Sequence, residues 1–169
     1  MGTVTFRQKN ALDLLVEQHD RIDALLEAVA NEPLIERKQF LLEELAAVLT
    51  AHATMEEKLF YPVVRAVQTQ ELLDSSNHVA IRLALAQLRA TDVDDAHFDV
   101  ELAVLAEEIH QHAREDEEEI VFPKLRRLMS EEQLVSLGID MSVLFDRLIA
   151  AHAHPPVEAG RPIVPRSVK

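Results

Sequence analysis

A histidine followed about one helical turn later by an acidic residue occurs twice in this chain, and the two copies have similar surroundings. The first copy is His52-Ala-Thr-Met-Glu56, which leads through apolar residues to Pro62. The second begins at His112 and leads in the same way to Pro123. Residues i and i+4 lie on the same face of an α-helix. The repeat therefore predicts two long helices that each present a nitrogen and an oxygen ligand on one face.

Two further histidines, His19 and His78, lie upstream of these copies. In each half of the chain, the two histidines lie at nearly equal distances from the polar break between them, which is centred on Pro33 or Asp95. Residues equidistant from the turn of an antiparallel helix pair lie at the same height. The four histidines are therefore predicted to form one layer of a helical bundle.

Four stretches with helical hydrophobic periodicity fit this arrangement. They cover approximately residues 5–30, 34–68, 72–90 or 75–90, and 96–129. The composition agrees with them, because 48% of the residues are hydrophobic while 4% are aromatic, which is typical of packed amphipathic helices. We expect an all-α fold, an antiparallel up-down-up-down four-helix bundle.

One or two short helices are predicted after the bundle. The capping sequence Ser130-Glu-Glu-Gln133 predicts the start of one helix, which Gly138 is expected to end. Asp140 is a candidate cap for another helix, and the proline-rich segment that follows predicts a disordered tail. The expected organisation is a helical domain over residues 1–152 and a disordered tail over residues 153–169.

The inward imidazoles and carboxylates predict a metal site. They interrupt stripes of Leu and Val, and an ionised carboxylate buried without a partner costs several kcal/mol or takes up a proton. No lysine or arginine shares these faces, and the chain has no cysteine, so a cation held by nitrogen and oxygen is expected. Mixed imidazole and carboxylate ligands suit iron or manganese, and their number suggests two ions.

The second carboxylate is ambiguous. Simple spacing nominates Asp116, four residues after His112. However, the apolar residues beyond it and Pro123 come one position late relative to the first copy. A π-bulge would absorb the extra residue, and Glu117 would then take the role of Glu56. The bulge favours Glu117, and both residues remain candidates.

The paired motifs resemble the hemerythrin-like, or HHE cation-binding, family over about residues 12–128. The resemblance implies a four-helix bundle around a non-haem di-iron centre, with two iron ions that carboxylates and an oxo group bridge. Such a centre reacts with dioxygen or related small oxidants. The implied ligands are His19, His52, His78 and His112 at terminal positions, with Glu56 and Glu117 or Asp116 as bridges.

The chain departs from oxygen-carrying hemerythrins at one position. Those proteins supply five histidines, two of them four residues apart on the third helix, whereas Asp74 and Arg82 flank His78 at this spacing. Asp74, a water or a further residue could replace the missing nitrogen. The departure favours redox chemistry, sensing or iron handling over reversible oxygen carriage.

Other polar and aromatic residues are expected to lie outside the site. Tyr61 lies about 180° from His52 on an ideal helix, so a role as a ligand would need a distorted helix. Phe60 and Phe122 are expected to wall the pocket, and the acidic run 115–119 is expected to be mostly solvated apart from the ligand. His110 is expected on another face of its helix from His112, and His97, His152 and His154 are expected at the surface.

The formal net charge of -13 opposes binding to nucleic acid or to an anionic membrane. No apolar run approaches the length of a membrane span, so we expect a cytoplasmic protein. The expected function is binding of, or reaction with, dioxygen, peroxide or nitric oxide. The alternative is storage or buffering of iron or other cations without turnover, and the oligomeric state is not predicted.

Overall fold

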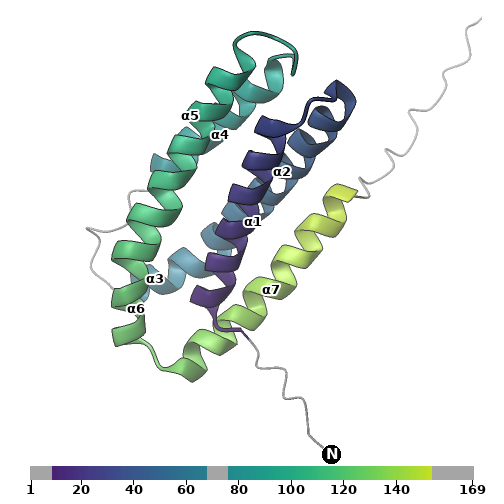
Figure 1. The fold of residues 1–169 in the computed structure, drawn as a ribbon. Helices are drawn as coiled ribbons and strands as arrows, with labels where there is room; N and C mark the ends of the chain where they lie inside the picture. Colours follow the sequence, from purple (N-terminus) through teal and green to yellow (C-terminus); the bar gives the residue numbers. More distant parts are fainter. Residues whose placement is uncertain (1–8, 68–75, 154–169) are drawn as a thin grey trace, which may run out of the picture.

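The computed structural model describes residues 9–67 and 76–153, and all their regular structure is helical (Figure 1). This confirms the predicted all-α class. We call each continuous helical stretch of the bundle a rod. Two of the four rods consist of an α-helix, a π-helical segment and a short final α-helix. The elements are α1 (Ala11–Asn31), α2 (Ile35–Met55), the π segment η1 (Glu56–Phe60), α3 (Tyr61–Val67), α4 (Ser76–Ala90), α5 (Phe98–His110), the π segment η3 (Gln111–Val121), α6 (Phe122–Leu128) and α7 (Glu131–Ala153).

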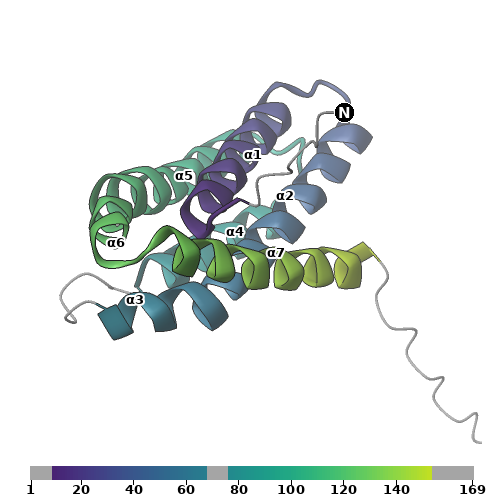
Figure 2. The same cartoon turned by 90° about the horizontal axis from the view of Figure 1, so that it is seen from below.

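The bundle is built from two helix pairs, α1 with α2 and α4 with α5. The connections inside both pairs lie at the same end of the molecule (Figure 1). α7 packs against α1 and α2 (Figure 2). The Asn10 side chain caps α1 by accepting a hydrogen bond from the Asp13 N–H at 2.9 Å. Within the described ranges, every helix is too short or too polar to cross a membrane.

The two rods that carry the repeated histidine–carboxylate motif change to π-helical geometry at that motif. The Tyr61 N–H donates to the Glu56 carbonyl, and the Phe122 N–H donates to the Glu117 carbonyl, five residues back in each case. The π-bulge predicted for the second copy is therefore confirmed. The π turn of the first copy was not predicted.

The sequence was misread after Ser130. The expected capping pair is confirmed, because the Ser130 N–H donates to Gln133 Oε1 at 2.9 Å and the Gln133 N–H donates to Ser130 Oγ at 3.2 Å. However, the two short helices expected there are one helix of 23 residues that continues through Gly138. The expected helix start near residue 5 lies outside the described residues, as do residues 154–169 of the expected tail, whose first residue, Ala153, is the last residue of α7.

Gly138 has a packing role instead of a stop role. It is buried where α7 meets the start of α1, and a Cβ atom there would lie 2.6 Å from the Lys9 carbonyl oxygen and 2.8 Å from the Ala11 nitrogen. Both atoms belong to backbone, which cannot rotate away as a side chain can. The glycine therefore allows close approach of two chain segments that are far apart in sequence.

Gly138→Ala should therefore destabilise the protein, although alanine is the better helix former by about 1 kcal/mol. The clash with backbone outweighs that gain, and we expect the free energy of unfolding to fall by about 1–3 kcal/mol. Urea unfolding followed by circular dichroism measures the change. Ser136→Ala, at an exposed position of the same helix, is the control and should not destabilise. A Gly138→Ala protein as stable as the wild type would contradict the packing role.

Candidate metal centre

Four buried histidines come together in the middle of the bundle as two pairs. His19 of α1 lies against His52 of α2, with ring centroids 5.1 Å apart. His78 of α4 lies against His112 of η3, with ring centroids 4.6 Å apart. We call His19 and His52 the first half-site and His78 and His112 the second half-site. The predicted histidine layer is thus present.

Glu56 lies between the two half-sites and is fully buried. Its Oε1 atom lies 3.3 Å from His52 Nε2 in the first half-site. Its Oε2 atom lies 3.2 Å from His78 Nε2 and 3.8 Å from His112 Nε2 in the second half-site. One carboxylate therefore offers an oxygen to each histidine pair.

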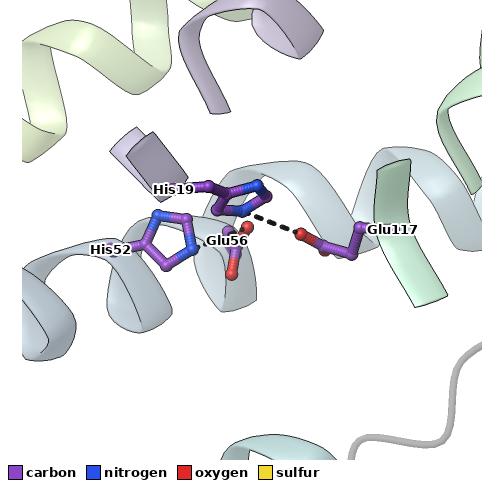
Figure 3. A group of neighbouring side chains, drawn as sticks. All are labelled: His19, His52, Glu56 and Glu117. Atoms are coloured by element: carbon purple, nitrogen blue, oxygen red, sulfur yellow. Dashed lines mark ion pairs between the residues drawn. The ribbon is translucent and has the colours of Figure 1, made fainter. Parts of the chain in front are cut away.

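Glu117 faces both half-sites in the same manner. Its Oε2 atom lies 3.3 Å from His19 Nε2, and its Oε1 atom lies 4.0 Å from His112 Nε2. Figure 3 shows the side chain directed toward His19, with Glu56 and His52 beside it. The ligand atoms form two compact groups that share Glu56. The groups are His19, His52, Glu56 and Glu117, and Glu56, His78 and His112.

The structure distinguishes between the two acidic candidates of the second copy. Glu117 is buried beside His19, whereas Asp116 is half-buried and belongs to neither group, although its charge acts on His112. Glu117 also matches Glu56 in register, because each accepts the five-residue backbone hydrogen bond of its π turn. The extra residue of the second copy therefore falls between His112 and Glu117.

Polar atoms without hydrogen bonds gather at this centre. In the described residues they include His19 Nε2, both carboxylate oxygens of Glu56, and Glu117 Oε2. Buried polar atoms in native proteins are almost always paired. Three of these four atoms are carboxylate oxygens, which attract a cation. The donor set therefore fits bound metal ions.

The two carboxylates affect each other through their charges. Burial and the neighbouring charge of Glu56 raise the pKa of Glu117. Burial also acts to raise the pKa of Glu56, but His52 and the other histidines outweigh it and hold the pKa well below its usual range. Burial lowers the pKa of His52 to about 3. Burial opposes protonation of His112 as well, yet Glu56 and Glu117 raise its pKa to about 9. The carboxylates therefore favour positive charge at His112, whereas burial disfavours it at His52.

In three of the histidines, the Nδ1 nitrogen contacts a polar side chain that the sequence analysis did not predict. His19 Nδ1 lies 2.7 Å from Glu118 Oε1, and His78 Nδ1 lies 3.1 Å from Glu57 Oε1. The third contact joins His52 Nδ1 to Gln18 Oε1 at 2.8 Å. Such contacts fix the ring and direct Nε2 toward a metal.

One signal in the sequence could have identified two of these side chains. Glu57 and Glu118 each directly follow an inward carboxylate. Glu118 was instead assigned to a solvated acidic run.

Tyr61 lies in the site, contrary to the expectation from an ideal helix. Its hydroxyl donates to Glu117 Oε1 at 2.9 Å and lies 3.2 Å from His112 Nε2. The π turn at Glu56–Phe60 adds a residue to the turn and so rotates Tyr61 toward the centre. Burial and the nearby carboxylates raise the pKa of Tyr61 far above its usual range, so the group is a neutral hydrogen-bond donor.

The corresponding residue of the second copy is Phe122, which is stacked 6.2 Å from His19. The second half-site therefore has a phenol where the first has an apolar ring. Phe122 also packs edge-on against Phe60 at 5.9 Å, and both are buried.

The remaining expectations concern residues outside the centre. His97 and His152 are exposed, as predicted, and His110 is exposed while His112 is buried, which agrees with its expected position on another face. Arg82 is exposed and donates a hydrogen bond to Glu57. The candidate ligand Asp74 and the surface residue His154 lie outside the described residues.

Comparison with known proteins agrees with this geometry. Residues 10–125 match the family described as Hemerythrin HHE cation binding domain. A protein named DNA nickase from Nostoc sp. (strain PCC 7120) is 29% identical over 130 residues, which make up 73% of this chain and 36% of that protein. The chain thus spans little more than a third of the length of this relative, and no solved structure matches. The paired motifs, the bundle and the family match together show that the chain belongs to the hemerythrin HHE cation binding domain family.

Proposed function

We propose that this protein holds a non-haem di-iron centre that binds or reacts with dioxygen, peroxide or nitric oxide. The observation that supports it most is the position of Glu56 and Glu117, each with one oxygen toward each histidine pair. Carboxylates in this position suit bridges between two ions, and imidazole with carboxylate suits iron. An oxo bridge belongs to the same proposal.

The ligand set leaves room for a small molecule. The first half-site offers two imidazole nitrogens with oxygens of Glu56 and Glu117 in one compact group. The second offers two imidazole nitrogens and an oxygen of Glu56, with Glu117 Oε1 4.0 Å from His112 Nε2. Iron accepts about five or six ligands in such surroundings, so these residues leave coordination positions open. Bound iron would supply redox and Lewis-acid chemistry. Phe122 stacks beside His19 and Phe60 packs against Phe122, so the first half-site has an apolar wall on this side.

The two half-sites differ in what they offer an incoming molecule. Tyr61 places a hydroxyl donor at the second half-site, and Phe122 occupies the corresponding place at the first. A small oxidant accumulates negative charge on oxygen as it is reduced, and the Tyr61 hydroxyl can stabilise such charge when its proton turns from Glu117 to the bound molecule. The proposal therefore assigns the reacting molecule to the second half-site.

Tyr61→Phe should leave metal content unchanged and slow peroxide consumption about tenfold or more, the effect of losing one hydrogen bond to a charged group. Metal analysis and the initial rate of peroxide loss measure the two effects on the same sample. The variant removes one oxygen atom and keeps the ring, so packing is preserved. Unchanged turnover would contradict the role of the hydroxyl, and loss of metal would show that Tyr61 is a ligand.

The general test is the metal content and optical spectrum of the purified protein. The proposal predicts about two irons per chain and near-ultraviolet absorption from an oxo bridge. Peroxide should be consumed, or oxygen or nitric oxide should change the spectrum. The alternative function, storage or buffering of iron or other cations, predicts binding and exchange of metal without either response.

The proposal does not include DNA cleavage, although one relative is named DNA nickase. The net charge of -13 opposes approach to a polyphosphate, and we propose a cytoplasmic protein without a nucleic-acid or membrane partner. The metal-loaded protein should leave supercoiled plasmid intact. Relaxation faster than with an equal concentration of free metal would contradict this part of the proposal.

A further inference from the structure

Glu57 directly follows the inward carboxylate Glu56, and Glu118 directly follows Glu117. Neither Glu57 nor Glu118 faces the centre as its neighbour does. Glu57 Oε1 lies 3.1 Å from His78 Nδ1, and Glu118 Oε1 lies 2.7 Å from His19 Nδ1. In each π segment, the inward carboxylate and the carboxylate that directly follows it therefore take different positions. One faces the centre, and the next reaches the outer nitrogen of a histidine.

These contacts cross between the two helix pairs. Glu57 belongs to η1, which continues α2, and it holds a histidine of α4. Glu118 belongs to η3, which continues α5, and it holds a histidine of α1. Neither glutamate supports a histidine of its own pair. By contrast, Gln18 of α1 holds His52 of α2 within one pair.

An arginine fixes each of these glutamates from the outside. Arg82 donates to the same Glu57 oxygen that contacts His78. Arg114 Nη1 donates to Glu118 Oε1 at 2.6 Å, while Arg114 Nη2 is held by Asp20 at 2.8 Å and by Asp23 at 2.6 Å. The arginines balance the charge of the glutamates and restrict where they can move. Two similar chains of contacts thus run from the surface to opposite half-sites.

We propose that Glu57 and Glu118 are crossed positioning residues, so that each helix pair orients a metal-binding histidine of the other. The inference rests on the proposed metal centre. Glu57 supports the second half-site and Glu118 supports the first. Removal of one glutamate frees one imidazole to rotate, which weakens binding mainly at the half-site that contains it. Contacts of this type change metal affinity by about 10- to 100-fold.

The test uses manganese(II) alone as the probe, because a close pair of these ions and an isolated ion give different electron paramagnetic resonance spectra. The wild type should bind two ions and show the spectrum of a coupled pair. Glu57→Ala and Glu118→Ala should each bind one ion about 10- to 100-fold more weakly and show an isolated ion at intermediate concentrations. Glu119→Ala, an exposed position of the same π segment as Glu118, is the matched control and should behave as the wild type.

Conservative variants separate orientation of the ring from simple loss of charge. Glu57→Gln and Glu118→Gln keep an oxygen that can accept a hydrogen bond from Nδ1–H, so they should restore most of the affinity. Glutamine variants as weak as the alanine variants would overturn the proposal. Because glutamine keeps the size of the side chain, this comparison also holds if an alanine variant fails to fold.

Combined variants test the crossing itself. In a His78→Ala protein, Glu57→Ala should have little further effect, because its histidine is already absent, whereas Glu118→Ala should still weaken binding of the remaining ion. The opposite pattern would overturn the proposal. If the wild type bound a manganese pair and all single variants matched it, the crossed positioning alone would fail. A wild type that bound no metal would overturn the proposed function as well.

Discussion

A protein in which His52 and His112 are both replaced by alanine is expected to lose both metal ions. The two residues belong to different half-sites, and each directs Nε2 toward Glu56, at 3.3 Å for His52 and 3.8 Å for His112. Their loss leaves one imidazole in each half-site and an incomplete ligand set for both ions. Metal content after purification should fall from about two ions per chain to almost none.

The control for this prediction is a histidine that lies near the site in sequence but outside it in space. His110 is exposed on the same rod as His112, so His110→Ala should retain full metal content. Circular dichroism should show that the double variant remains helical, because the hydrophobic core around the centre is unchanged. Full metal content in a folded His52→Ala, His112→Ala protein would exclude this ligand assignment.

Glu117→Ala is expected to lose metal, whereas Asp116→Ala is expected to retain it. Glu117 is buried, with its two oxygens directed at both half-sites, and Asp116 is half-buried outside both ligand groups. In the proposed centre Glu117 bridges two ions, so its loss would remove one ligand from each ion at once. We therefore expect the affinity for metal to fall by more than the 10- to 100-fold that is typical when a residue contacting a ligand, but not the metal, is removed.

These two substitutions remove carboxylates at adjacent positions, so they serve as controls for each other. Metal titration of both variants under the same conditions measures the difference. Loss of metal in Asp116→Ala together with full loading in Glu117→Ala would show that the register derived from the π turns is wrong. Equal loss in both would contradict the assignment of a single bridging residue to this segment.

The bundle and the histidine layer could be predicted because their signals are periodic. Apolar stripes place the helices, and equal distances from Pro33 and Asp95 place the histidines at one height. The π turn of the second copy was also visible, because Pro123 arrives one residue late relative to Pro62. These features depend on the spacing of residues along the chain, and this spacing can be counted in the sequence.

The features that the sequence analysis missed depend on tertiary contacts. Both copies contain a π turn. Comparison of the copies reveals the one extra residue of the second copy, but it cannot reveal a π turn that both copies share. Tyr61 was therefore placed on the wrong side of its helix. Glycine often ends a helix, and Gly138 was therefore expected to end one. Its close approach to the backbone of Lys9 and Ala11 explains why a glycine lies inside α7 instead. Glu118 was hidden in an acidic run that begins and ends with the exposed residues Glu115 and Glu119.

The central claim is that two ions lie between the histidine pairs, each sharing oxygens of Glu56 and Glu117. Crystals of the protein loaded with iron, with anomalous diffraction recorded at the iron absorption edge, test it most directly. The account predicts two peaks about 3.5–4 Å apart, one beside His19 and His52 and the other beside His78 and His112. A single peak, or peaks away from these four histidines, would contradict it.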